Sequence, residues 1–373
     1  MSKIMFEQRY FIDKSFWAGS NSKTPLIVYL GGEDPIDNEV QAIGVINQAA
    51  PKFRALVLYI EHRFYGVSVP FGSIDIALGD LEVRRCLTSE QALVDFAKII
   101  IDVKKKLLDQ HVPVVVIGCS YSGILAAWFR LKYPNITIGA LASSAPVYFD
   151  MDVPFEYDFF SVVSNDYKIV NQKCYDRIQK SWAMIDNIGR ERAQGHSYLT
   201  ELFKTCNPLV SVEALKLSLV SYYTSYAQYN GRYNGGINGV CEEIVKASDD
   251  DLLGGIARSA IDGFSCYNVD YFMANTNTSG SSFNLDNATK AWNWQVCSEF
   301  IFRNGVGNDT MFQPEPFNLT IRLDYCNTKY HIRPRTHWVS TYFNGYVSFT
   351  LVFIKFTLVI NLLISSLWIL VIF

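Results

Sequence analysis

The chain has 373 residues, of which 49% are hydrophobic, and its 33 basic and 36 acidic residues give a formal net charge of −3. A chain of this length can bury a large core and indicates two domains or one large decorated domain. Its basic residues are dispersed and are not interleaved with aromatic residues, which argues against nucleic acid as a partner.

Cysteines and glycosylation sequons point to the secretory pathway. The eight cysteines form no C-x-x-C pair and no His/Cys spacing suited to zinc, so disulfides explain most of them better than a metal site, and no cofactor is expected. N-x-[ST] sequons begin at Asn135, Asn277, Asn287, Asn308 and Asn318. The opening "MSKIMFEQRYFIDK" nevertheless lacks the apolar core of a signal peptide.

The first part of the chain alternates between predicted strands and helices. An amphipathic helix is expected from Ser89 to Leu107, and Thr88 with Gln91 forms a candidate capping box at its start. Apolar runs predict buried strands at "PLIVYL" (25–30), "ALVLYI" (55–60), "VPVVVI" (112–117) and "ITIGALASSAP" (136–146). This order predicts an α/β fold with a mostly parallel sheet, whose ligands lie at the carboxyl ends of the strands.

The stretch "VVVIGCSYSGILAAWF" (Val114–Phe129) is typical of a strand, a sharp turn and a helix, with Ser120 at the turn. Such an elbow projects the serine hydroxyl above the sheet and aims the next N–H and the helix N-terminus at developing negative charge. The usual pattern is Gly-x-Ser-x-Gly. Here Gly118 is present, but Ser122 replaces the second glycine and Gly123 follows it. By motif alone, an ordinary βα turn is an equal alternative.

From about Val153 the pattern changes to longer helical periodicities, as in 175–188 and 212–230, with six cysteines. We interpret this part as a helical, disulfide-stapled domain inserted over the sheet. The expected division is a core with the nucleophile elbow at 1–150, a helical cap at 151–335, the start of a returning core segment at 336–346 and an apolar tail at 347–373.

The apolar tail carries one charge, Lys355, and the residues after it are sufficient for one membrane-spanning helix over Phe356–Phe373. Two interpretations stay open. The tail anchors the protein to a membrane, or it is a segment that forms no ordered part of a working protein.

Eight segments between Gln8 and Gly345 resemble, in the same order along the chain, segments of the prolyl carboxypeptidase and dipeptidyl-peptidase II family of serine peptidases. The resemblance is closest to the plant lysosomal Pro-X carboxypeptidase-like members of this family. The eight segments are "QRYFIDKSFW", "YLGGEDPID", "LVLYIEHRFYGVSVPFGS", "GCSYSGILAAWFRLKYPNITIGALASSAPV", "CYDRIQKSW", "VCSEF", "GNDTMFQPEPFNL" and "PRTHWVSTYFNG". The resemblance implies an α/β-hydrolase fold with an inserted helical cap. It also implies acyl transfer next to a penultimate proline in a peptide substrate, and a vacuolar, lysosomal or extracellular location.

The resemblance also implies roles for single residues. Ser120 matches the nucleophile, and the Tyr121 N–H is expected as one oxyanion donor. Gly31 or Gly32 is the candidate for the second donor, with a plain glycine turn as the alternative. Ile124 matches a position that helps to line the proline pocket, with an ordinary core role as the alternative.

Family positions further imply three disulfides that staple the cap, namely Cys174–Cys241, Cys206–Cys266 and Cys297–Cys326. Cys86 and Cys119 remain as free thiols. Although Cys119 neighbours Ser120, a side chain beside the apex of the elbow points away from the site, so we expect a buried structural thiol.

The partners of the nucleophile are missing from their family positions, because the Asp- and His-bearing segments expected after "HWVSTYFNG" are absent and the apolar tail stands there instead. The five histidines, His62, His111, His196, His331 and His337, are not expected to substitute. Three hypotheses therefore compete: an active serine exopeptidase, a member truncated at both ends with defective catalysis, and a membrane-attached binding module that keeps the peptide pocket.

Overall fold

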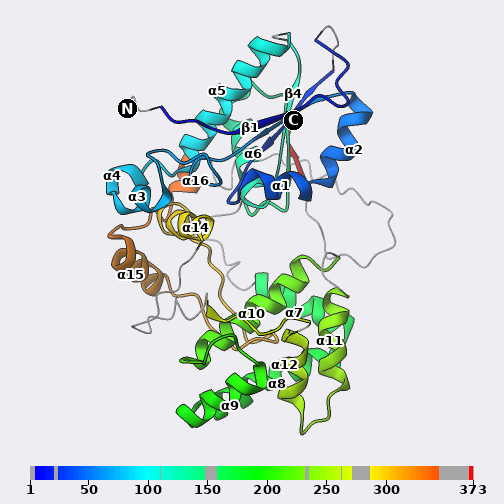
Figure 1. Cartoon of the computed structure of the whole chain (residues 1–373), viewed down its shortest axis with the longest axis vertical. Helices are drawn as coiled ribbons and strands as arrows, with labels where there is room; N and C mark the ends of the chain where they lie inside the picture. The colour runs from blue at the N-terminus through cyan, green and yellow to red at the C-terminus, as the bar shows by residue number, and fades with distance from the viewer. Residues whose placement is uncertain are drawn as a thin grey trace. The chain divides into compact units, whose positions relative to one another are not determined.

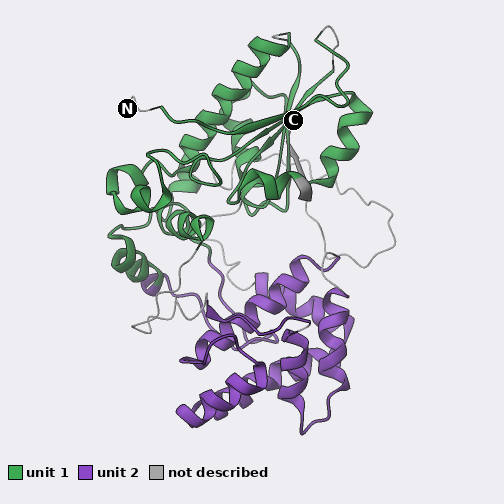
Figure 2. Cartoon of the chain, in the orientation of Figure 1, with its two compact units in different colours: residues 1–151, 286–302, 322–373 green, residues 152–285, 303–321 purple. Residues whose placement is uncertain are grey.

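The computed structural model describes residues 5–20, 24–109, 111–147, 158–231, 235–261, 263–270, 286–343 and 369–372. The chain divides into two compact units, coloured separately in Figure 2. Unit 1 comprises residues 1–151, 286–302 and 322–373, and unit 2 comprises residues 152–285 and 303–321.

Unit 1 is built on one six-stranded sheet with the order β1-β3-β2-β4-β5-β6. The pairings β3–β2, β2–β4 and β4–β5 are parallel, whereas β1 and β6 are antiparallel at the two edges. The strands are β1 (Tyr10–Asp13), β2 (Leu26–Leu30), β3 (Leu56–Ile60), β4 (Val114–Cys119), β5 (Gly139–Ser143) and β6 (Ile369–Ile372). The predicted α/β fold with a mostly parallel sheet is thus confirmed.

Helices cover both faces of this sheet, which explains why its central strands are apolar throughout (Figure 1). One set of alternate strand residues, such as Val28 and Leu58, packs with α5 (Ser89–Leu107) and α6 (Tyr121–Lys132). The other set, such as Tyr29 and Val57, packs with α1 (Ile36–Ala42) and α2 (Gly44–Phe53).

The remaining helices of unit 1 are short or lie late in the chain. They are α3 (Ile74–Gly79), α4 (Leu81–Arg84), α14 (Asn287–Ser298), α15 (Leu319–Tyr330), whose first three residues fall in unit 2, and α16 (Trp338–Tyr342). Trp294 of α14 is buried in a cluster with Phe64 and Tyr65, residues that follow β3. This burial explains why α14 belongs to unit 1.

Unit 2 is helical and contains one extended apolar core. Its helices are α7 (Asp158–Val170), α8 (Gln172–Gly189), α9 (Ala193–Phe203), α10 (Val212–Gln228), α11 (Gly236–Lys246) and α12 (Leu252–Ile261). Cys174–Cys241 links α8 to α11, and Cys206–Cys266 closes a second loop.

The structure differs from the expected organisation in two places. The third disulfide, Cys297–Cys326, lies in unit 1 and not in the helical unit where the resemblance put it, because α14 packs on unit 1. The segment expected as one cap at 151–335 is accordingly shared between both units.

Most of the expected tail helix, residues 356–368 and 373, lies outside the described residues. Contrary to the expected helix, Ile369–Ile372 form β6, a strand that pairs antiparallel with β5. β-branched Ile and Val favour an extended edge strand. In the described part of the chain, no helix is both long and apolar enough to span a bilayer.

Candidate active site

Ser120 occupies the sharp turn between β4 and α6. Its backbone has φ 57° and ψ −125°, a sparsely populated conformation for a residue with a side chain. The Ser120 N–H donates to the Ser143 carbonyl of β5 at 3.0 Å, and the Ser120 carbonyl accepts from the Ile124 N–H at 3.0 Å. A strained serine held from both sides at the carboxyl end of a central strand is the geometry of a nucleophile elbow.

Ser122, which stands where the family pattern has glycine, is hydrogen-bonded on both sides. The Ser122 side chain is buried, and its hydroxyl donates to the Leu30 carbonyl at 2.5 Å and accepts from the Cys119 N–H at 3.3 Å. Glycine is still required at 118, where a Cβ would lie 2.0 Å from the Ser122 carbonyl oxygen. The serine at position 122 thus adds a hydrogen bond between the elbow and β2.

The Tyr121 side chain points into a buried polar network behind the elbow. Its hydroxyl lies 2.9 Å from Ser89 Oγ, 2.9 Å from Gln295 Nε2 and 3.1 Å from His62 Nε2. Glu299 continues the network by accepting from the Ser89 N–H at 3.0 Å and from Gln295 Nε2 at 3.1 Å. Three segments far apart in the chain therefore fix the residue that follows Ser120.

Burial controls the protonation states in this network. It raises the pKa of Glu299 to about 7, against which the Ser89 and Gln295 hydrogen bonds act. It lowers the pKa of His62 to about 3, so this imidazole is neutral at physiological pH. The network was not found from the sequence, because hydrogen-bonded members such as Ser89 and Glu299 are 210 residues apart and show no local pattern.

The loop after β2 brings the predicted oxyanion glycines beside the elbow. A Cβ on Gly32 would lie 3.2 Å from Ser122 Cβ and 3.3 Å from the Ser122 nitrogen, so Gly32 packs against the first turn of α6. The Gly31 N–H donates to the Ile60 carbonyl at 2.8 Å and is engaged in the sheet. Of the two candidates, only Gly32 directs its N–H to a side chain.

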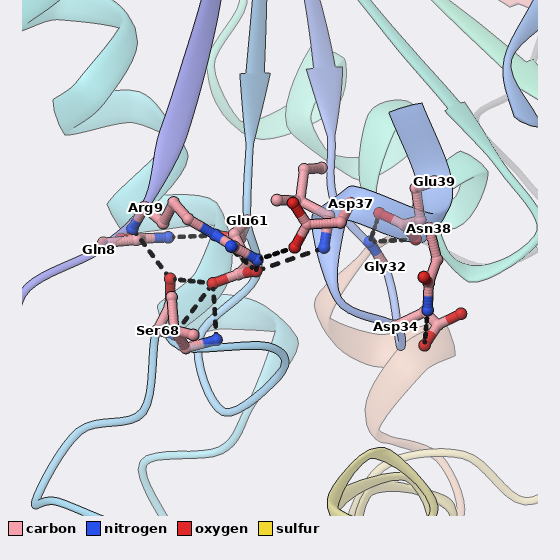
Figure 3. A network of polar contacts seen from close by, with 11 residues as sticks. Gln8, Arg9, Gly32, Asp34, Asp37, Asn38, Glu39, Glu61 and Ser68 are labelled. Carbon is pink, nitrogen blue, oxygen red and sulfur yellow. Dashed lines mark hydrogen bonds and ion pairs between the residues drawn. The ribbon is translucent and has the colours of Figure 1, made fainter. Parts of the chain in front are cut away.

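That side chain is Glu39 of α1, whose carboxylate oxygens accept from the Gly32 N–H at 3.0 and 3.2 Å (Figure 3). Burial raises the pKa of Glu39 well above its ordinary value, and the acidic neighbours Glu33 and Asp34 raise it further. Glu39 was not identified from the sequence, since an acidic residue early in a short helix is common.

A second carboxylate, Glu61, sets the position of α1 (Figure 3). It is fully buried at the end of β3 and accepts from the Ile36 N–H at 3.3 Å, from the Ser68 N–H at 2.9 Å and from the Arg9 guanidinium. Arg9 also pairs with Asp37 of α1 at 2.6 Å. These contacts connect β1, β3 and the start of α1, the helix that carries Glu39.

The histidines of unit 1 make no hydrogen bond to Ser120 in the described residues. All four of them, His62, His111, His331 and His337, are described. His62 is fully buried, with Nδ1 2.6 Å from the Arg63 carbonyl oxygen and Nε2 beside Tyr121. The described residues also contain no group of three or more His, Cys, Asp and Glu that could hold a metal ion.

The structure places the other predicted residues as follows. Ile124 is buried in the core formed by the sheet, α5 and α6. Cys119 is exposed, contrary to the buried thiol we expected, because it is the last residue of β4 at the open end of the sheet. The sequon residues Asn135, Asn287, Asn308 and Asn318 are exposed, and Asn277 lies outside the described residues.

Comparison with known proteins decides the family. A family profile described as serine carboxypeptidase S28 matches residues 1–343. The chain belongs to the S28 family of serine carboxypeptidases. It is 32% identical to the lysosomal Pro-X carboxypeptidase of Mus musculus over 362 residues, which cover 91% of this chain and 70% of the relative.

Two further relatives of this S28 chain come from Homo sapiens. The lysosomal Pro-X carboxypeptidase is 32% identical over 358 residues, covering 91% of this chain and 70% of the relative. The thymus-specific serine protease is 30% identical over 235 residues, covering 61% of this chain and 44% of the relative. The resemblance to a serine peptidase family seen in the sequence is thus confirmed.

Proposed function

We propose that the chain carries a serine-type exopeptidase site that cleaves peptides next to a penultimate proline through Ser120. The observation that carries this proposal is the strained turn at Ser120, with φ 57°, immediately before the N-terminus of α6. The names of the two Pro-X carboxypeptidase relatives support proline-containing peptides as substrates and a lysosomal or secretory location.

In the proposed acyl transfer, Ser120 Oγ attacks the carbonyl carbon of the scissile bond and loses its proton to a base. The carbonyl oxygen becomes an oxyanion that accepts hydrogen bonds from the Tyr121 N–H and the Gly32 N–H. The leaving group takes the proton as the bond breaks, and water then hydrolyses the ester on Ser120. Ile124, one turn after Ser120, is proposed to shape the proline pocket from beneath.

The residues present in this sequence limit the rate. After Gly345 the sequence contains neither aspartate nor histidine, and the described histidines of unit 1 do not bond to Ser120. Without a base, oxyanion donors and substrate binding alone leave a rate acceleration of about 10³- to 10⁴-fold over the reaction in water. We therefore propose that this chain turns over Pro-X peptides thousands of times more slowly than a relative carrying both partners.

The test compares the chain with a version in which a family segment bearing the aspartate and histidine replaces the residues after Gly345. We expect slow turnover and weak labelling by a fluorophosphonate in the original chain, and faster turnover in the chimera, with Ser120→Ala abolishing both. Equal activity in the two proteins, lost in Ser120→Ala, would show that a base is already present. Peptide binding without turnover in either protein would instead support a non-catalytic binding module.

A further inference from the structure

The carboxylate of Glu39 accepts a hydrogen bond from the amide that the proposed mechanism needs for the oxyanion. Both oxygens of Glu39 face the Gly32 N–H, at 3.0 and 3.2 Å, and Gly32 itself packs against Ser122 of the elbow helix. A carboxylate oxygen and a tetrahedral oxyanion are both anionic acceptors, so they compete for the same donor.

We propose that Glu39 is a positioning residue that occupies the Gly32 N–H in the resting protein and must leave before this amide can bind the substrate oxyanion. This inference rests on the proposed function, because it assigns the Gly32 amide to the acyl-transfer step. The occupied amide is itself a property of the structure alone.

The contact is held in place by the surrounding elements. Glu61 and Arg9 fix the start of α1, through the Ile36 N–H and Asp37 respectively, so Glu39 is presented to the loop after β2 by an anchored helix. The Gly31 N–H is engaged with the Ile60 carbonyl, which fixes the orientation of the next peptide unit. Glu39 and Gly32 therefore meet as a consequence of how β2, β3 and α1 are joined.

The charges around Glu39 favour its release in acid. Several titratable groups interact with Glu39. They are Glu33 and Asp34 in the loop after β2, Glu61 and Tyr65 after β3, Tyr29 in β2, and Cys119 at the end of β4. These are acidic or neutral, and Arg9, the described cation of this network, is paired with Asp37 and Glu61. Burial and the like charges raise the pKa of Glu39, so acid neutralises it early and weakens its hold on the amide.

The occupancy can be measured on the Gly32 amide of the full chain. The sequence contains three Gly-Gly pairs, so combined ¹³C-carbonyl and ¹⁵N labelling of glycine selects the amides of Gly32, Gly236 and Gly255. We expect one signal, that of Gly32, to shift between pH 7.5 and pH 4.5 in the wild type. Glu39→Gln abolishes this shift, while Asp102→Asn, at an exposed carboxylate of α5, retains it. Three signals that behave alike in all of these proteins would overturn the inference.

Labelling of Ser120 by a fluorophosphonate provides the second readout and separates the two proposals. One oxyanion donor is worth about 10² to 10³ in rate, so freeing a partly blocked donor is expected to accelerate labelling at pH 7.5 by roughly tenfold in Glu39→Ala. Glu39→Gln, which keeps a neutral acceptor, should give a smaller gain and guards against misfolding of the alanine variant. At pH 4.5, where wild-type Glu39 is protonated and resembles glutamine, the advantage of Glu39→Gln should disappear and that of Glu39→Ala should shrink.

The outcomes are distinguishable. Labelling that Ser120→Ala abolishes, but that is equal in wild type, Glu39→Ala and Glu39→Gln at both pH values, refutes the role of Glu39 and leaves the proposed function intact. A Gly32 signal that follows Glu39 in proteins that never label at Ser120 refutes the proposed function while the occupied amide stands.

Discussion

The buried carboxylate of Glu299 predicts an unusual dependence of stability on pH. Its pKa is about 7 in the folded chain, against an ordinary value of 4.5. Below pH 4.5 both the folded and the unfolded chain hold the proton, so this group has no effect. Between pH 4.5 and 7 the folded chain keeps a proton that the unfolded chain has released, so the free energy of unfolding falls as pH rises. At about 1.36 kcal/mol per pKa unit, the loss reaches about 3 kcal/mol above pH 7.

Glu299→Gln removes this titration while mimicking the protonated acid. One Glu299 oxygen accepts from the Ser89 N–H, the Ser89 hydroxyl and Gln295 Nε2, and the amide oxygen of glutamine can replace it. The other oxygen lies 3.2 Å from the Ser89 nitrogen, whose N–H keeps its 3.0 Å acceptor in the variant. It also faces Arg335 at 3.6 Å, a half-exposed side chain that can move away from the new amide group. We therefore expect the variant to exceed the stability of the wild type by only about 1 kcal/mol at pH 5 and by about 3 kcal/mol at pH 8.

Urea unfolding followed by tryptophan fluorescence at pH 5, 6, 7 and 8 tests this expectation. Of the seven tryptophans, Trp182 alone belongs to unit 2, so the signal reports mainly on unit 1, which contains Glu299. Asp102→Asn, a change at an exposed carboxylate on α5, is the control and should follow the wild type. Wild-type and Glu299→Gln stabilities that remain parallel from pH 5 to pH 8 would refute the assigned role of this carboxylate.

Three further substitutions follow from the contacts of the elbow and α14, each measured as the urea midpoint. Ser122→Gly leaves the buried Leu30 carbonyl without its donor and should cost about 1–3 kcal/mol, and an unchanged midpoint would contradict the role of this hydroxyl. Tyr121→Phe removes a hydroxyl with three polar neighbours and should cost a similar 1–3 kcal/mol, roughly. Replacing Cys297 and Cys326 by serine opens a loop with a sequence separation of 29 and should cost about 3–4 kcal/mol, unless the reduced chain is equally constrained.

Local patterns were sufficient for the central sheet and for α5. Apolar runs at 25–30 and 55–60 correspond to β2 and β3, and the predicted helix Ser89–Leu107 has the bounds of α5. Thr88 caps that helix by accepting from the Gln91 N–H, as expected. The Gln91 side chain does not return to Thr88, however, because it accepts from Arg63 at 2.7 Å, a contact that spans 28 residues.

Other parts could not be predicted because their causes lie outside the local sequence. The edge strand β1 is short, and its antiparallel register with β3 depends on residues about 50 positions away. Helix α1 begins after Pro35 without a side-chain cap, so its start shows no sequence signal beyond the proline. The assignment of α14 to unit 1 depends on contacts of Trp294 with residues that follow β3, across more than 200 positions.

The candidate site divides in the same way between local and distant causes. The place of Ser120 at the turn was predicted because a strand, a turn and a helix follow one another in the sequence. What holds this serine comes from other segments: the Ser143 carbonyl of β5, the Leu30 carbonyl that binds Ser122, and the network that binds Tyr121. Since a strained turn persists only when its surroundings determine it fully, the hydrogen bond of Ser122 compensates for the glycine that the family pattern places there. Replacing a glycine at this elbow therefore exchanges backbone freedom for a polar contact with β2, and the position of Ser120 comes to depend on that contact.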